Sequence, residues 1–161
     1  MDVLEAVFQS IGEEARSGSI GRPVCVRASF VLSADHGRLA TTLARAGAAA
    51  LRWLADEPLD LFVSGGVRSG HISVLAQGAT GTTALVSVAL LREEVPSADI
   101  LVLGDRGSLH HEGAANAPHE DLGSSSWNDG DLTPAEKRFL EAIESSLERS
   151  SVVRPAPGEK R

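Results

Sequence analysis

Histidines and glutamates gather in and just after one glycine-bracketed stretch, GDRGSLHHEG. His110, His111 and Glu112 are adjacent, and His119 and Glu120 follow a few residues later. Imidazole nitrogens and carboxylate oxygens bind zinc, and both groups carry protons in acid-base catalysis. Neighbouring residues of a strand point to opposite faces of a sheet, so a metal site would use only one of the adjacent histidines and would also need His119. The pattern therefore favours the polar end of a hairpin strand over a metal site.

Three further residues are candidates for contact with a substrate or a partner. Asp35 and His36 stand before a predicted long helix, where a charge-assisted pair is one interpretation and a helix cap by Asp35 is the better fit. Trp127 is a large aromatic residue among polar ones, which is typical of an anchor on the protein's own sheet or on a partner. The candidate contacts on a substrate or partner side are therefore Asp35, His36, His110, His111 and Trp127.

Two other side chains are expected to be structural. His71 opens a predicted strand and is expected to be an exposed residue at the strand end. Cys25 is the single cysteine, so it cannot form an internal disulfide, and its apolar neighbours favour a buried thiol. We therefore predict no catalytic, metal-binding or cofactor-binding residue in this chain.

The composition excludes several classes of partner. The 161 residues include 15 basic and 22 acidic side chains, a net charge of -7, which disfavours a nucleic-acid surface. The chain has no run of about 18 apolar residues that could cross a bilayer, and its N-terminus lacks the basic and apolar segments of a secretory signal. We therefore expect a cytoplasmic protein that binds neither nucleic acid nor membrane.

Hydrophobic periodicity predicts three helices and five or six strands. Apolar residues spaced three and four apart predict helices over 3–18 and 39–56, and alternation predicts strands such as 22–32. Thr133 and Glu136 predict a capping box for a closing helix. Met1 directly before a helix favours a complete gene product. The predicted organisation is one domain over 1–150, with a long loop over 113–131, the closing helix over 133–150 and a disordered tail over 151–161.

The order of these elements predicts the fold class. Most strands follow one another through turns of a few residues, so consecutive strands must run antiparallel, which excludes a doubly wound parallel sheet. The predicted fold is α+β, with an open, mostly antiparallel sheet and helices on one face. Apolar residues occupy both faces of the segment TTALVSVALL, so the second face of the sheet is expected to serve oligomerisation.

Five segments, in this order, match one known pattern: SGSIGRPVCVRASF, LRWLADEPLDLFVSGG, HISVLAQGATGTTALVSVALL, ILVLGDRGSLHHE and TPAEKRFLEAIESSLERSS. Together they resemble the C-terminal domain of the glucose-fructose oxidoreductase and inositol dehydrogenase (Gfo/Idh/MocA) family, over residues 5–150. The resemblance implies the same α+β fold and self-association through the open face of the sheet.

The resemblance also implies groups that this sequence does not contain. Family members carry a Rossmann domain that binds NAD or NADP, and a Glu-Lys-Pro motif whose lysine assists catalysis. Here no Gly-x-Gly-x-x-Gly follows a strand, and the two lysines, Lys137 and Lys160, lie outside any Glu-Lys-Pro. Family enzymes also place His-x-x-Asp on the long helix, where this sequence has Ala46 and Ala49. Neither alanine can transfer a proton, so we expect no activity from this chain alone.

Three functions are compatible with these features. The first is a stand-alone, non-catalytic relative of the oxidoreductase C-terminal domain, an oligomerisation or accessory subunit that forms a homo-dimer or larger homo-oligomer. The second is the substrate half of a split sugar or polyol dehydrogenase, which would meet NAD(P) only through a separately encoded Rossmann-domain subunit. The third is a small-molecule binding module.

Overall fold

The computed structural model describes residues 3–33, 39–56, 58–91, 97–114 and 132–149. The elements in chain order are α1 (Val3–Arg16), β1 (Pro23–Ser33), α2 (Leu39–Leu54), β2 (Pro58–Gly66), the short helix η1 (Val67–Ser69), β3 (His71–Gly78), β4 (Thr83–Leu91), β5 (Ser97–Gly104), β6 (Ser108–Ala114) and α4 (Pro134–Arg149). None of the helices in these ranges is long and apolar enough to cross a membrane.

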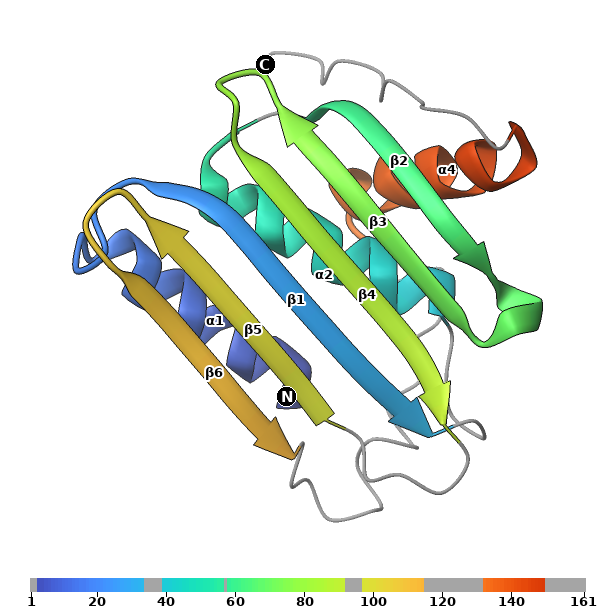
Figure 1. Ribbon diagram of the computed structural model, residues 1–161, viewed down its shortest axis with the longest axis horizontal. Helices are drawn as coiled ribbons and strands as arrows, with labels where there is room; N and C mark the ends of the chain where they lie inside the picture. Colours follow the sequence, from blue (N-terminus) through green and yellow to red (C-terminus); the bar gives the residue numbers. More distant parts are fainter. Residues whose placement is uncertain (1–2, 34–38, 57, 92–96, 115–131, 150–161) are drawn as a thin grey trace.

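The six strands form one sheet in the order β2-β3-β4-β1-β5-β6 (Figure 1). Every neighbouring pair is antiparallel except β1 and β4, which run parallel at the centre of the sheet. The chain leaves β1 through α2, builds the meander β2-β3-β4, and thereby brings β4 back beside β1. The predicted α+β fold with an open, mostly antiparallel sheet is confirmed.

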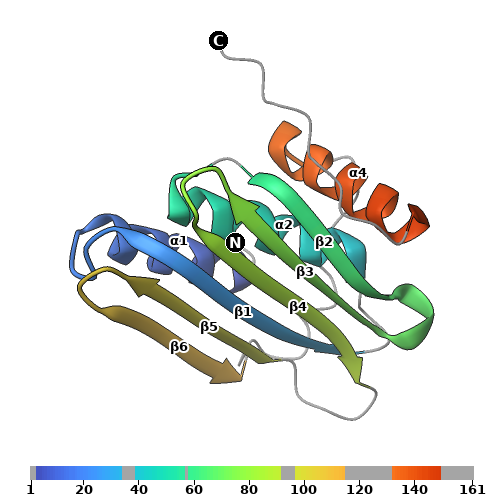
Figure 2. The same ribbon diagram turned by 45° about the horizontal axis from the view of Figure 1, so that its top comes forward.

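The described helices lie together on one face of the sheet, with α2 behind its centre, α1 towards β6 and α4 towards β2 (Figure 2). Alternate residues of every inner strand point into this layer, as the alternation of β1 predicts. We call the opposite face of the sheet, which no described element covers, the open face. The core under the helices includes Val26, Ala28, Phe30, Leu61, Ile72, Val74, Val86, Val88, Ile100 and Val102.

Small side chains let α2 lie close to its neighbours. Gly47 lies directly against the ring of Phe139 from α4, and a Cβ at position 47 would overlap that ring. Near the end of the helix, Trp53 meets Phe8 of α1 edge-on, with 5.8 Å between ring centroids, and Phe8 meets Phe30 of β1 in the same way. The close packing of this helix therefore involves the sheet and both α1 and α4.

The closing helix α4 begins as its sequence predicts and protects an edge of the sheet. The Thr133 amide donates to the Glu136 carboxylate at 2.7 Å, and the Glu136 amide donates to the Thr133 hydroxyl at 3.3 Å, which is the predicted capping box. Near its end, the Ser146 hydroxyl accepts a hydrogen bond of 3.3 Å from the amide of Val63 in edge strand β2. Bonding of this kind blunts an edge strand that could otherwise pair with another chain.

One carboxylate ties the end of α2 to a hairpin turn. Oδ2 of Asp56 accepts hydrogen bonds from the Thr80 amide at 3.1 Å, the Thr80 hydroxyl at 2.6 Å and the Thr82 hydroxyl at 2.7 Å. Thr80 and Thr82 flank Gly81, whose φ of +84° makes the tight turn between β3 and β4. Asp56 thus joins the connection between α2 and β2 to the next hairpin along the chain.

Three expectations need correction or lie outside the described residues. The thiol of Cys25 is on the open face and only partly buried, because Cys25 alternates with the buried Val26. Residues 113 and 114, expected in the long loop, belong to β6, and residues 115–131 lie outside the described residues, as does the tail. The long helix, expected over 39–56, ends at Leu54, because Ala55 leaves the helical conformation with a φ of +50°.

We expect Ala55→Gly to stabilise the fold by about 0.5–1 kcal/mol. Glycine adopts a left-handed backbone conformation without the Cβ penalty that alanine has there, and this gain exceeds the entropy that glycine adds to the unfolded chain. Urea unfolding followed by circular dichroism measures the change. Ala135→Gly, at an exposed position of the first turn of α4, is the control and is expected to lose up to about 1 kcal/mol. A loss of stability in Ala55→Gly contradicts the prediction.

We expect Asp56→Ala to destabilise the protein by about 1–3 kcal/mol, since hydrogen bonds to a carboxylate are among the stronger ones and three donors lose their acceptor. Asp56→Asn keeps one acceptor oxygen without the charge, so its unfolding midpoint is expected between those of Asp56→Ala and the unsubstituted protein. An unchanged midpoint in Asp56→Ala shows that the turn is held by other contacts.

Candidate functional site

The glycine-bracketed stretch that suggested chemistry is a hairpin turn between β5 and β6. The amide of Gly104 donates to the carbonyl of Gly107 at 2.8 Å, which closes the turn around Asp105 and Arg106. Gly104 lies so close to the carbonyl of Ile20 that a Cβ would overlap it. Gly104 is therefore required for a close approach of two backbones.

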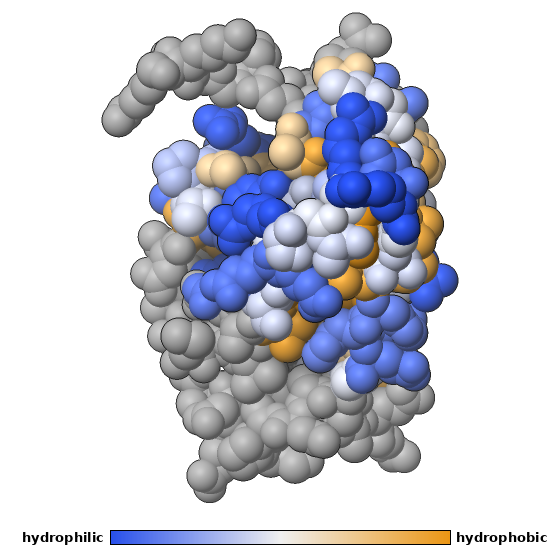
Figure 3. Space-filling model, turned by 90° about the vertical axis from the view of Figure 1, so that its left-hand side faces the viewer, coloured by the Kyte–Doolittle hydropathy of each residue, from blue (hydrophilic) through white to orange (hydrophobic). Residues whose placement is uncertain are grey.

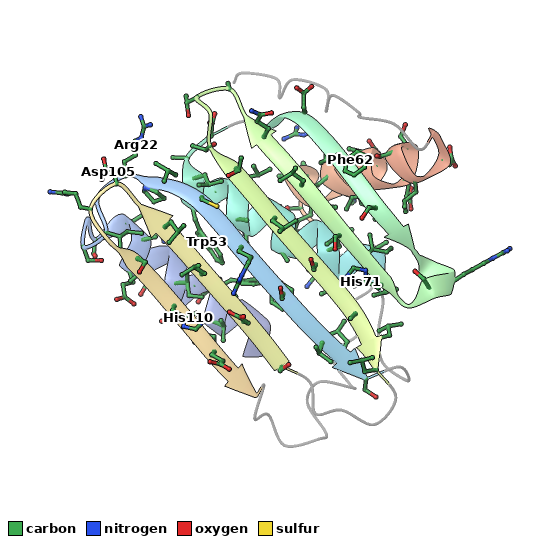
Figure 4. The ribbon with its side chains drawn as sticks, viewed as in Figure 1. Arg22, Trp53, Phe62, His71, Asp105 and His110 are labelled. Atoms are coloured by element: carbon green, nitrogen blue, oxygen red, sulfur yellow. The ribbon has the colours of Figure 1, made fainter. Side chains whose placement is uncertain are left out.

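The side chain of Asp105 binds the connection between α1 and β1. One carboxylate oxygen accepts a hydrogen bond of 2.9 Å from the amide of Arg22, and the amide of Asp105 donates to the carbonyl of Arg22 at 3.0 Å. Figure 4 shows Arg22 and Asp105 together at one end of the sheet. The same carboxylate occupies the space of a Cβ on Gly21, whose φ is +75°. Asp105 thus has a structural role.

The two adjacent histidines point to opposite faces, as predicted. His110 stands opposite Leu101 on the open face, whereas His111 stands opposite the buried Ile100 on the helical side. His110 and His71 both lie on the open face, but β6 and β3 are four strand spacings apart, about 19 Å at 4.8 Å per spacing. His71 is exposed at the start of β3, as expected, and its Nε2 lies 3.3 Å from the Ser73 hydroxyl.

His110 belongs to a polar group on the open face that the sequence does not reveal. Nε2 of His110 lies 3.0 Å from Oδ1 of Asp99, and the guanidinium of Arg27 donates to Oδ2 of Asp99 at 3.1 Å. The three side chains come from β6, β5 and β1 and are all partly exposed to solvent. Asp99 therefore bridges two basic groups across three strands.

Within the described residues, no three or more His, Cys, Asp and Glu side chains come close enough to bind a metal ion. The other members of the candidate set, Asp35, His36 and Trp127, lie outside the described residues, together with His119 and Glu120. Their predicted roles as substrate or partner contacts stay predictions.

The positions that the resemblance assigns to a proton-transferring pair are in the core. Ala46 is 1% exposed and Ala49 is 0% exposed, and both belong to the main hydrophobic cluster. They lie on the helix that packs against the centre of the sheet and against α4. A substrate at either methyl group would have to displace packed apolar side chains.

The open face has a regular pattern of side chains across all six strands. The strand registers align one row of mostly large side chains, the apolar row: Phe62, Leu75, Leu85, Arg27, Leu101 and His110. Beside it they align a row of small hydroxyls and acids, the serine row: Ser64, Ser73, Ser87, Ser29, Asp99 and Glu112.

Large apolar side chains are exposed on this face. All five of the large hydrophobic residues that the described surface exposes lie there, each next in sequence to a residue in the core or packed against it: Phe62 at 46%, Leu75 at 44%, Leu85 and Leu91 at 40%, and Leu103 at 38%. The side of the molecule that carries α1 and β6 is mainly hydrophilic in its described part (Figure 3). The large apolar side chains that the described residues expose are therefore gathered on the open face.

Comparison with known proteins finds solved structures of similar fold but no relative by sequence. No protein-family model and no curated protein matches this chain. The fold is similar to that of the WlbA dehydrogenase from Bordetella pertussis in complex with NADH and UDP-GlcNAcA (18% identity, TM-score 0.66, 94% of this chain and 60% of that chain). It is also similar to that of myo-inositol 2-dehydrogenase from Lactobacillus plantarum (10% identity, TM-score 0.68, 92% of this chain and 61% of that chain). A third similar structure is a putative myo-inositol dehydrogenase from Sinorhizobium meliloti (15% identity, TM-score 0.64, 92% of this chain and 62% of that chain).

This chain spans about three fifths of the length of these solved structures. Identities of 10% to 18% establish the fold and leave the activity open. The resemblance inferred from the sequence is thus confirmed at the level of structure: the chain has the oxidoreductase-like α+β fold of myo-inositol dehydrogenases and related Gfo/Idh/MocA oxidoreductases, over an extent consistent with their C-terminal domain.

Proposed function

We propose that this chain is a non-catalytic relative of the oxidoreductase C-terminal domain and acts as an oligomerisation or accessory subunit. The observation that carries the proposal is the contrast between its two faces. On the helical side, Ala46 and Ala49 are packed in the core where the resemblance would place a proton-transferring pair. On the other side, the sheet presents its large apolar residues to solvent.

The open face has the size and chemistry of a protein interface. Five strand spacings of about 4.8 Å and three two-residue steps of about 6.8 Å span roughly 24 by 20 Å, or on the order of 500 Å² before side chains extend it. A standard stable interface buries about 800 Å² on each partner, which this face approaches once its rim is included. Covering it removes the exposed leucines and Phe62 from water, at about 25 cal/mol per Å² of apolar surface.

A second candidate is the substrate half of a split dehydrogenase. It is favoured by the neighbours' names, since several of their structures contain NAD or NADH and about two fifths of each chain has no counterpart here. In this alternative a partner subunit binds the NAD(P), and this chain lines the substrate side. Co-purification from the native source separates the two functions, because a split enzyme is recovered with a nucleotide-binding protein and a self-associating subunit without one.

We expect the protein to sediment as a homo-dimer or larger homo-oligomer, and Leu85→Glu to dissociate it. A carboxylate on each copy of a buried interface costs at least about 3 kcal/mol in total, a rise of roughly a hundredfold in the dissociation constant. Sedimentation equilibrium measures this, and an unchanged circular dichroism spectrum shows that the variant is folded. Lys137→Glu, exposed on α4, is the matched control and is expected to remain associated. A monomeric parent protein contradicts the proposal.

We expect no binding of NAD(H) or NADP(H) by the purified chain, because its sequence contains no Gly-x-Gly-x-x-Gly motif that could hold a pyrophosphate at the start of a helix. Isothermal titration calorimetry measures this with each nucleotide in turn. A micromolar dissociation constant for any of the four would show that the chain binds the cofactor itself and would remove the non-catalytic assignment.

A further inference from the structure

The two edges of the sheet differ in how they are protected. At one edge, the hydroxyl of Ser146 in α4 binds the amide of Val63 in β2. At the other edge is β6, and no described strand or helix lies beyond it (Figure 1). The seven residues of β6 include neither proline nor lysine, two residue types with which proteins often block an edge. Within the described part of the chain, β6 is therefore a strand with one unpaired side.

The pairing of β6 with β5 determines which backbone groups of β6 point outward. The amide of Gly104 donates to the carbonyl of Gly107, and hydrogen-bonded and non-hydrogen-bonded pairs alternate along the antiparallel ladder from there. The amides and carbonyls of Leu109, His111 and Gly113 therefore face β5. The outward-facing groups belong to the residues that alternate with these: Ser108, His110, Glu112 and Ala114.

Two of the outward-facing residues have side chains of complementary charge. His110 and Glu112 are two positions apart on the exposed, open-face side of β6. Glu112 stands opposite Asp99 of β5, which is a like charge, whereas Asp99 itself is bound by Arg27 and His110. Among the described residues, Glu112 has no ion pair or side-chain hydrogen bond. A basic group from another chain would offset the repulsion at Glu112.

We propose that β6 pairs antiparallel with β6 of a second copy of this chain, about a two-fold axis perpendicular to the sheet at His111. His110 of each copy then stands opposite Glu112 of the other, in a pair that exchanges backbone hydrogen bonds. Two sheets of six strands thereby become one continuous sheet. The contact goes beyond the proposed function, because it uses an edge of the sheet and leaves the open face uncovered.

The charges of β6 select this register. Moving the axis by one residue to His110 places His110 opposite its own copy, and moving it to Glu112 does the same for Glu112. Like charges directly opposite each other destabilise an antiparallel pair, whereas opposite charges stabilise it. In the register centred on His111, Asp99 and Glu112 of the second copy lie on either side of His110. This register also pairs all seven residues of β6.

The contact is small, so we expect it to be weak and reversible. Seven residues at about 3.4 Å each span roughly 24 Å, and one added strand buries less than the 800 Å² or so per partner of a standard stable interface. A covalent trap is therefore the suitable probe. At the axis the two copies of His111 form a non-hydrogen-bonded pair, whose Cα atoms are about 4.5 Å apart, within the range that a disulfide spans.

His111→Cys in a Cys25→Ser background, incubated in a glutathione redox buffer, tests the pairing. We expect a disulfide-linked dimer on a non-reducing gel. Ser108→Cys, exposed on the same strand, is the matched control and is expected to stay unlinked, because it lies about 20 Å from its own copy in this register. Glu112→Arg added to His111→Cys is expected to slow linkage about tenfold, since it opposes two basic side chains. Absence of the His111→Cys dimer, or equal linkage of Ser108→Cys, overturns the pairing.

The same variants separate this contact from the proposed function. His111 lies on the helical side of the sheet, so association through the open face does not bring its two copies together. Linkage is therefore expected in a Leu85→Glu background as well, and its loss there overturns the pairing at the edge. Linkage of a parent protein that sediments as a monomer removes the proposed function and leaves the pairing intact.

A measurement on the unsubstituted protein covers the case in which His111→Cys does not fold, as judged by circular dichroism. The amides of His110 and Glu112 point outward in the single chain and are hydrogen-bonded in the pair. We expect their hydrogen exchange to slow as the protein concentration rises, whereas the amide of Arg68 in η1, at the opposite side of the sheet, keeps its rate. Exchange at His110 and Glu112 that is independent of concentration overturns the proposal.

Discussion

The parallel pairing of β1 with β4 is the constraint on which the rest of this structure depends. It joins two antiparallel units of three strands, β2-β3-β4 and β1-β5-β6, into one sheet. It also determines the register between the units, because Arg27 stands beside Leu85 and Ser29 beside Ser87. Without this pair the apolar row and the serine row would each be two unrelated halves. The open face is a single surface only because the two units share this register.

The same pairing accounts for the close packing around Ala46 and Ala49 on the helical side of the sheet. The crossover from β1 to β2 passes through α2, which therefore lies over the central strands. Alanines and Gly47 let the helix approach the sheet and α4, and Ala46 and Ala49 become core residues as a result. A histidine or aspartate there would place several more heavy atoms in a packed interior, and its charged form would also lose its hydration. In this chain the close packing of α2 therefore leaves no space for an acid-base group at these two positions.

The parts of the structure that the sequence predicts are those controlled by near neighbours. The alternation of β1, the hairpin at Gly104 and Gly107 and the capping box at Thr133 each depend on a few adjacent residues, and each is confirmed. The group formed by Arg27, Asp99 and His110 depends on pairings between distant strands, so no local pattern reveals it. The serine row is hidden for the same reason. Apolar residues in both alternating sets of β4 predict that the open face exposes apolar side chains, but they do not predict its rows.

The turn between Gly104 and Gly107 shows why two proteins can share a fold without sharing catalytic residues. Gly104 is required because two backbones meet there, and the carboxylate of Asp105 binds the amide of Arg22. These demands are steric and local, and they hold wherever the connection before the first strand passes beside this hairpin. The fold does not require a catalytic group on α2. Alanines at positions 46 and 49 are therefore compatible with the turn, the sheet and the closing helix. The motifs that identify the fold are therefore independent of those that would identify an activity.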